Sequence, residues 1–195
     1  MSDEMKSTFE TRSKTLIGLA ICCSVAILTC VQVDKETVTA TPEEEVPAAA
    51  NPLIGTALEI LEAFNADDWE AFKTLMTDDA VYEEVGTSQT IKGVDSIIEQ
   101  LKGWKGAMPD VKGTVDNSEL TEKGVLLEVT WTGTNTGPLV GPHTVSKYGP
   151  EGFPATGKVQ TTRAAWVLEF DGPKVSRSRH YFDMLSFMKQ LGVIE

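Results

Sequence analysis

The stretch that decides the fold is KVQTTRAAWVLEFDGPKVSRSRHYFDMLSFMKQLG, residues 158–192. It holds two runs of strand character, 158–170 and 174–182, on either side of Asp171-Gly172-Pro173, a turn sequence. Residues 183–191 carry apolar side chains at helical spacing, and Gly192 is placed to end that helix. The stretch predicts a β-hairpin followed by a short helix.

The chain before this hairpin changes from helical to strand character. Apolar residues recur at helical spacing between 53 and 64, Asp67 or Asp68 is placed to cap a second helix, and Gly93 precedes a third. Residues 80–84 form a short candidate strand, and 111–120 and 125–132 follow as further strands. Helices followed by antiparallel strands indicate an α+β domain with the helices on one sheet face.

The first 50 residues differ in composition from the rest. Residues 16–31, LIGLAICCSVAILTCV, form an uncharged apolar run, which predicts an apolar helix of the signal-peptide or signal-anchor type. Basic residues precede it and acidic ones follow, so we expect the body of the chain outside the cytoplasm. Residues 27–30 resemble a bacterial lipobox with Cys30 as the lipidated residue, although Thr29 departs from the usual small residue. Lipoprotein and uncleaved anchor both stay open.

This composition divides the chain into three parts. Residues 1–32 are the expected signal, lipoprotein-type or signal-anchor segment. Residues 33–50 are acidic and rich in proline and alanine, a composition that cannot bury a core and predicts a disordered linker. Residues 51–195 are the expected folded domain.

Charge and residue counts exclude several kinds of function. The 195-residue chain has a formal net charge of −12, which argues against nucleic acid as a partner. All three cysteines precede residue 31 and the chain has two histidines, so the domain offers neither a cysteine zinc site nor a three-histidine one. We therefore expect no metal site of these kinds.

Four stretches resemble one known family. The order of elements resembles the nuclear transport factor 2-like fold, and within that superfamily the SnoaL-like polyketide cyclases, also called ester cyclases. The matching stretches are 65–69 with 77–82, 91–97 leading to Pro109-Asp110, 133–137 with 154–158, and Tyr181-Phe182-Asp183 with Gln190-Leu191-Gly192. The resemblance implies a curved, mostly antiparallel sheet wrapped around N-terminal helices to form a cone with one pocket.

The resemblance also implies cofactor-free acid/base chemistry. In this family a carboxylate in an apolar cone moves a proton at carbon next to a carbonyl, and Asp183 matches the aspartate of the Tyr-x-Asp motif. Asp183 lies between a strand and an apolar helix, where desolvation would suit a general acid or base. The same position suits a helix N-cap, so both interpretations stay open.

Other residues are predicted to contact the substrate. Asn135 stands where the family commonly has histidine, and Tyr181 shares strand parity with Asp183. His180 has the opposite parity, so we expect it outside the pocket. The residues predicted to bind substrate, as pocket wall or polar contact, are Tyr82, Trp131, Asn135, Trp166 and Tyr181.

A second enzymatic interpretation rests on residues 78–86. This stretch resembles the one that carries the general base of ketosteroid isomerases, which makes Glu84 an alternative base. That chemistry needs an oxyanion partner such as a tyrosine on the first helix, and the first helix offers only Phe64. The simpler interpretation places Glu83 and Glu84 at a solvated acidic edge.

Two classes of function therefore remain. One is an enzyme of cyclase or isomerase type that acts on a hydrophobic carbonyl compound. The other is a non-catalytic module of the same fold that binds a ligand or forms a homodimer through the sheet. In both, the expected partners are a hydrophobic small molecule and, through the N-terminus, a membrane.

Overall fold

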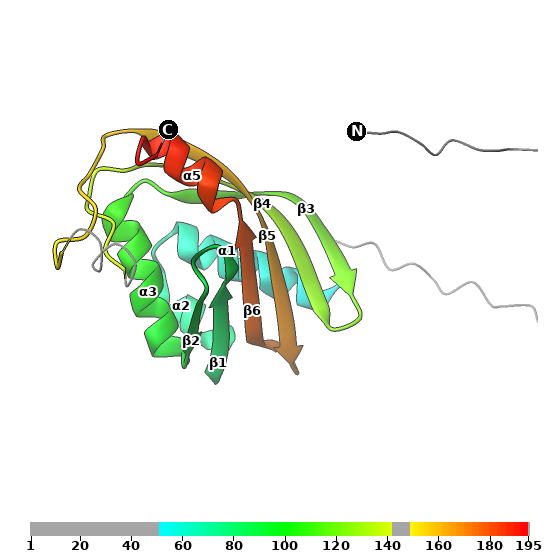
Figure 1. The fold of residues 1–195 in the computed structure, drawn as a ribbon. Helices are drawn as coiled ribbons and strands as arrows, with labels where there is room; N and C mark the ends of the chain where they lie inside the picture. The colour runs from blue at the N-terminus through cyan, green and yellow to red at the C-terminus, as the bar shows by residue number, and fades with distance from the viewer. Residues whose placement is uncertain (1–50, 142–148, 195) are drawn as a thin grey trace, which may run out of the picture. The chain divides into compact units, whose positions relative to one another are not determined.

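The computed structural model describes residues 51–141 and 149–194, whose arrangement Figure 1 shows. A six-stranded curved sheet has the strand order β2-β1-β6-β5-β4-β3, and α1, α2 and α3 lie together on one side of it (Figure 1). The strands are β1 Met76–Glu84, β2 Gln89–Lys92, β3 Lys112–Thr121, β4 Gly124–Thr134, β5 Val159–Asp171 and β6 Lys174–Phe182. The helices are α1 Pro52–Asn65, α2 Trp69–Thr74, α3 Val94–Ala107 and α5 Met184–Leu191, with a 3-10 turn at Val85–Thr87.

Local signals place the ends of the helices. Asn51 caps α1 by accepting a hydrogen bond from the Leu53 N–H, and Pro52 occupies the first turn, where its missing N–H costs nothing. Asp68 caps α2, which resolves the choice between Asp67 and Asp68. Gly192 ends α5 in the left-handed conformation that glycine adopts easily.

The sheet confirms the predicted α+β class. Four of its five strand pairings are antiparallel, and β1 pairs with β6 in parallel. The parallel pair brings a strand from the first half of the domain beside the last strand. Residues from both ends of the domain therefore share the centre of the sheet.

A β-bulge in β6 changes which side chains face the helices. Phe170 pairs with Val175, but Glu169 pairs with Arg177, so Ser176 is one residue too many for the ladder. An extra residue reverses the alternation of side chains beyond it. Before the bulge Val175 is buried. After the bulge Ser178 is buried, whereas strict alternation from Val175 would have buried Arg177.

The core lies between the helices and the concave face of the sheet. α1 packs against β3 and β4, and α3 packs against β1. The largest completely buried apolar side chains come from both layers: Ile54, Ile60, Leu61, Phe72, Met76, Ile97, Met108, Leu127, Leu168 and Leu191.

The predictions for the N-terminus lie outside the described residues. These are the apolar helix, the lipidation candidate Cys30 and the linker of residues 33–50. In the part of the chain that the structure describes, no helix has the length and apolar character needed to cross a bilayer.

Candidate active site

A cavity of about 70 Å³ lies between the sheet and the helices. Its wall is mostly aromatic and aliphatic, and a few polar side chains interrupt it. Such a site, apolar with few polar groups, is typical of a pocket for a small molecule. The lining residues are Phe64, Tyr82, Glu84, Leu101, Trp104, Met108, Val111, Trp131, Gln160, Thr162, Trp166, His180, Phe182 and Phe187.

Glu84 is the one carboxylate in this lining, and it is 1% exposed. Its Oε1 accepts a 2.8 Å hydrogen bond from the Trp104 indole and a 3.3 Å one from the Tyr82 hydroxyl. Its Oε2 accepts a 2.6 Å bond from Thr87. Burial raises the pKa of Glu84 above its ordinary value of 4.5, and these hydrogen bonds oppose the rise.

His180 extends this hydrogen-bonded group across the sheet. The Trp131 Nε1 lies 3.0 Å from His180 Nε2, and His180 Nδ1 lies 3.3 Å from the Tyr82 hydroxyl. An indole N–H only donates, so His180 Nε2 is the unprotonated nitrogen and Nδ1 carries the proton. His180 then donates to Tyr82, and Tyr82 donates to Glu84.

The surroundings keep His180 and Tyr82 neutral. Burial lowers the pKa of His180 from 6.5 to about 4. Burial, with the nearby Glu84 charge as the second cause, raises the pKa of Tyr82 well above 10.0. Near neutral pH, His180 is therefore an uncharged donor that orients the Tyr82 hydroxyl toward Glu84.

Trp166 supplies a polar atom without a partner. Its side chain lines the cavity, the residue is 5% exposed, and its buried Nε1–H makes no hydrogen bond within the described part of the chain. An unsatisfied buried donor costs about 1–3 kcal/mol. Trp166 therefore carries a buried N–H beside the cavity that an acceptor atom brought within reach would satisfy.

The charged residues of β6 lie on the other face of the sheet. Arg177 pairs with Glu83, and Arg179 pairs with Glu169 at 2.6 Å. Among the described residues Glu84 takes part in no ion pair. Residues 51–141 and 149–194 contain no cluster of three or more His, Cys, Asp or Glu side chains that would hold a metal ion.

One protein-family model matches the chain. The model of the SnoaL-like polyketide cyclases matches residues 56–191, most of the chain. The chain belongs to this family. No curated protein matches it by sequence.

Solved structures of SnoaL-like and related proteins share the fold at low identity. A protein described as a SnoaL-like polyketide cyclase from Jannaschia sp. CCS1 is 17% identical, with a TM-score of 0.62 over 74% of this chain and 94% of that one. IdmH, a candidate polyketide cyclase from Streptomyces antibioticus, is 20% identical, with a TM-score of 0.58 over 73% and 99%. A protein of ketosteroid isomerase-like fold from Catenulispora acidiphila DSM 44928, solved with trimethylamine, is 16% identical, with a TM-score of 0.56 over 70% and 92%.

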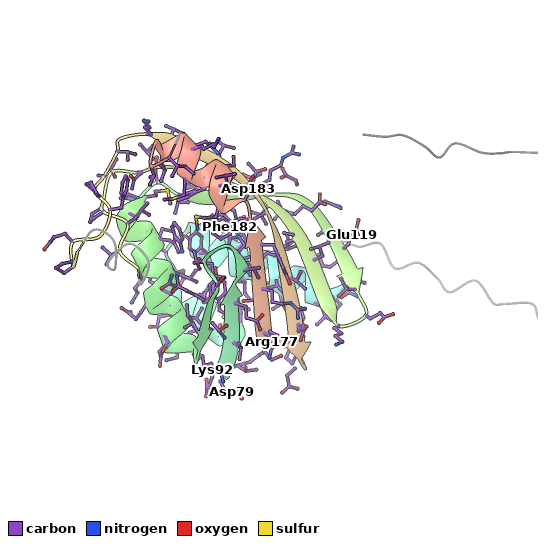
Figure 2. All side chains as sticks on the ribbon, in the orientation of Figure 1. Asp79, Lys92, Glu119, Arg177, Phe182 and Asp183 are labelled. Atoms are coloured by element: carbon purple, nitrogen blue, oxygen red, sulfur yellow. The ribbon has the colours of Figure 1, made fainter. Side chains whose placement is uncertain are left out.

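Within this SnoaL-like domain, Asp183 does not line the cavity. It is exposed at the junction of β6 and α5, as Figure 2 shows, and its Oδ1 accepts a 3.0 Å hydrogen bond from the Ser186 N–H. The structure therefore places Asp183 as the N-cap of α5. The expectation that its carboxyl points into the cone is wrong, because the Ser176 bulge reverses the parity on which it rested.

The capping role of Asp183 gives a testable difference in stability. We expect Asp183→Ala to lower the free energy of unfolding by about 0.5–2 kcal/mol, because Ala accepts no bond from Ser186. Asp183→Asn keeps an acceptor oxygen and should lose little. Urea unfolding of both variants measures the difference, and equal stability of the two would contradict the capping role.

Asn135 is also placed away from the cavity. It is completely buried, and its amide nitrogen donates to the backbone oxygens of Ala107 and Gly137 at 3.2 and 2.8 Å. Its Oδ1 accepts from the Thr156 backbone and hydroxyl at 2.9 and 3.1 Å. All its hydrogen-bonding groups hold three chain segments together, so the prediction of a substrate contact is corrected to a structural role.

Because of the bulge, His180 faces the cavity and Tyr181 faces away from it, the reverse of the prediction. Tyr181 is 42% exposed and is absent from the cavity lining, whereas His180 lines the cavity. Tyr82, Trp131, Trp166 and Glu84 do line it, so their substrate contacts remain predictions with a suitable location. The interpretation of Glu84 as a solvated edge residue is wrong, since it is buried.

Sequence reasoning overlooked other residues of the site. Trp104 lies on α3 and donates to Glu84, a contact that no local sequence pattern predicts. Gln160 and Thr162 are buried polar residues joined by a 2.6 Å hydrogen bond. In β5 these two residues alternate with exposed ones. Polar side chains on the inward face of a strand are unusual, and this pattern is the signal that could have identified them.

Proposed function

We propose that the domain catalyses cofactor-free proton transfer at carbon next to a carbonyl group in a hydrophobic compound, with Glu84 as the general base. One observation carries this proposal: a carboxylate without an ion pair among the described residues is buried in an apolar cavity. Burial without a cation makes a carboxylate a stronger base, and it places the pKa nearer to working pH. Membership of the SnoaL-like polyketide cyclases supports the same class of chemistry.

The reaction that we propose needs only this chain's side chains. The Glu84 carboxylate takes the proton from the carbon next to the carbonyl, and the electron pair of the broken C–H bond forms an enolate. The Nε1–H of Trp166, which lacks a partner within the described residues, donates to the enolate oxygen. The protonated Glu84 then returns its proton to carbon, or the enolate attacks a second carbonyl of the same molecule in a cyclisation.

This arrangement replaces the tyrosine that the ketosteroid isomerase comparison required on the first helix. α1 contributes Phe64 to the cavity, which offers no hydrogen bond. The available donor is instead an indole N–H on β5, opposite His180 in the ladder. Preorganised donors in a water-poor cavity stabilise a developing negative charge strongly.

Hydrogen–deuterium exchange at carbon tests the proposal directly. Methyl 3-oxobutanoate is a small ester with an acidic C2–H between two carbonyl groups. In D₂O buffer we expect the full chain to accelerate loss of the C2 proton signal in NMR spectra over buffer alone. Binding of the ester without acceleration would contradict the catalytic proposal and favour a binding module.

We also propose that the N-terminus anchors the chain to a membrane outside the cytoplasm. The uncharged run at residues 16–31 and the basic-to-acidic change across it support this. We expect the full chain in the membrane fraction and a chain that begins at Asn51 in the soluble fraction. Cys30→Ser should release a lipoprotein but not a signal anchor, and a full chain found in the cytosolic fraction would contradict both.

A further inference from the structure

A second, larger cavity adjoins the first. Its volume is about 430 Å³. It lies among the turn after β1, one side of α3, the apolar side of α5 and residues 139–141. Its lining residues are Gly86, Thr87, Ser88, Gln89, Gln100, Gly103, Trp104, Leu139, Val140, Gly141, Met184, Phe187 and Met188. The resemblance implied a cone with one pocket, so the second cavity is a difference from that expectation.

Trp104 and Phe187 line both cavities. With Phe182 they form a cluster of three rings in edge-on contact, whose centroids lie 5.7–6.5 Å apart. The Trp104 indole also donates to Glu84. The two cavities therefore share a wall that includes Trp104, the residue that donates to the candidate base.

The outer cavity has the chemical character of a site for an aliphatic chain. Met184 and Met188 are one helical turn apart on α5, and methionine side chains adapt to flexible apolar partners. Leu139 and Val140 add aliphatic surface. In the described lining no side chain is charged, whereas the uncharged polar side chains of Ser88, Gln89 and Gln100 would suit a weakly polar chain end.

We propose that the outer cavity binds the aliphatic tail of a compound whose carbonyl end reaches Glu84. The substrate class is then a 3-oxo acyl compound with a medium-length alkyl chain, and the inner cavity holds its dicarbonyl end. The placement of the carbonyl end rests on the proposed function; the binding of the tail does not. The two cavities meet at Trp104 and Phe187, so a ligand that spans both has to pass between these two rings or displace them.

Two glycines of α3 provide a matched pair of variants. Gly103 lines the outer cavity, and a Cβ added there meets no atom within 4 Å. Gly106 lines neither cavity, and a Cβ there also meets nothing within 4 Å. Gly103→Phe should occupy part of the outer cavity, and Gly106→Phe makes the same chemical change on the same helix elsewhere.

Calorimetric titration of the full chain with two esters tests the inference. Each buried methylene strengthens binding about fourfold, so wild type should bind methyl 3-oxodecanoate at least about tenfold more tightly than methyl 3-oxobutanoate. Gly103→Phe should reduce this preference to within about threefold. Gly106→Phe should keep it.

Three results would overturn the inference: no chain-length preference in wild type, an unchanged preference in Gly103→Phe, or an equal loss in Gly106→Phe. Unchanged binding of methyl 3-oxobutanoate by Gly103→Phe shows that the variant is folded. Failure of the proposed function is separate, because it appears as absent deuterium exchange while the chain-length preference and its loss in Gly103→Phe persist.

Discussion

Glu84→Gln should slow deuterium exchange of methyl 3-oxobutanoate by about 10²–10⁴-fold, the contribution that general base catalysis commonly makes. Gln keeps the shape of the side chain and one acceptor oxygen for Trp104 or Thr87, so the cavity should persist. Removing a buried carboxylate also removes its desolvation cost. We therefore expect the free energy of unfolding to stay unchanged or to rise.

Glu83→Gln is the matched control for this variant. Glu83 is the preceding residue, but its side chain pairs with Arg177 away from the cavity. Exchange by Glu83→Gln should equal that of wild type. A Glu84→Gln variant that retains exchange, or equal losses in the two variants, would show that Glu84 is not the base.

The pH dependence of exchange supplies a second readout on Glu84. Only the carboxylate form takes a proton from carbon, and burial raises the pKa of Glu84 above 4.5. The rate should therefore fall as pH decreases through that raised pKa, and the midpoint should lie above 4.5. A midpoint at or below 4.5 would argue against a buried base.

His180 should make the domain sensitive to mild acid. Its pKa is about 4 in the folded chain and 6.5 in its ordinary state. Between these values the unfolded chain binds a proton that the folded chain excludes, so protonation favours unfolding. The contribution of His180 to stability is intact above pH 6.5 and is lost as the pH falls toward 4. The shift corresponds to roughly 3 kcal/mol.

His180→Gln isolates this effect. Gln can accept from Trp131 and donate to Tyr82 but does not titrate. Urea unfolding between pH 7 and pH 4 should show wild type losing roughly 3 kcal/mol relative to the variant. Glu84 contributes with the opposite sign, because its raised pKa favours the folded state as pH falls, but it is common to both proteins. Parallel stability curves would show that His180 is not held neutral by burial.

Much of the fold was accessible from the sequence because its signals are local. Asn51, Asp68 and Asp183 each accept a hydrogen bond from an N–H two or three residues ahead. Such caps are local, so the sequence offered Asp68 and Asp183 as candidates, with Asp67 and a pocket position as the alternatives. The turn at Asp171-Gly172-Pro173 does join β5 and β6. The family resemblance rested on the same local stretches, and the family match confirms it.

The candidate site depended on contacts that no local pattern encodes. Glu84 is buried where β1 lies parallel to β6, a strand far away in the chain. The ion pair of Glu83 and Arg177 joins the two strands across 94 residues. Trp104 reaches Glu84 from a helix 20 residues away, and Trp131 reaches His180 across 49 residues. Residue types predicted that carboxylates and aromatic side chains form the site, but they did not predict which of these side chains contact one another.

A single extra residue in β6 decided which of its residues face the cavity. Strict alternation along β6 predicted Tyr181 and Asp183 inside the cone and His180 outside. The Ser176 bulge reverses that alternation, so His180 lines the cavity and Asp183 caps a helix. The sequence by itself predicted the hairpin, the family and the glycine that ends α5, and it offered the helix caps as candidates. Tertiary structure alone decided which carboxylate is buried, because strand pairing and its irregularities depend on the partner strands rather than on the strand's own sequence.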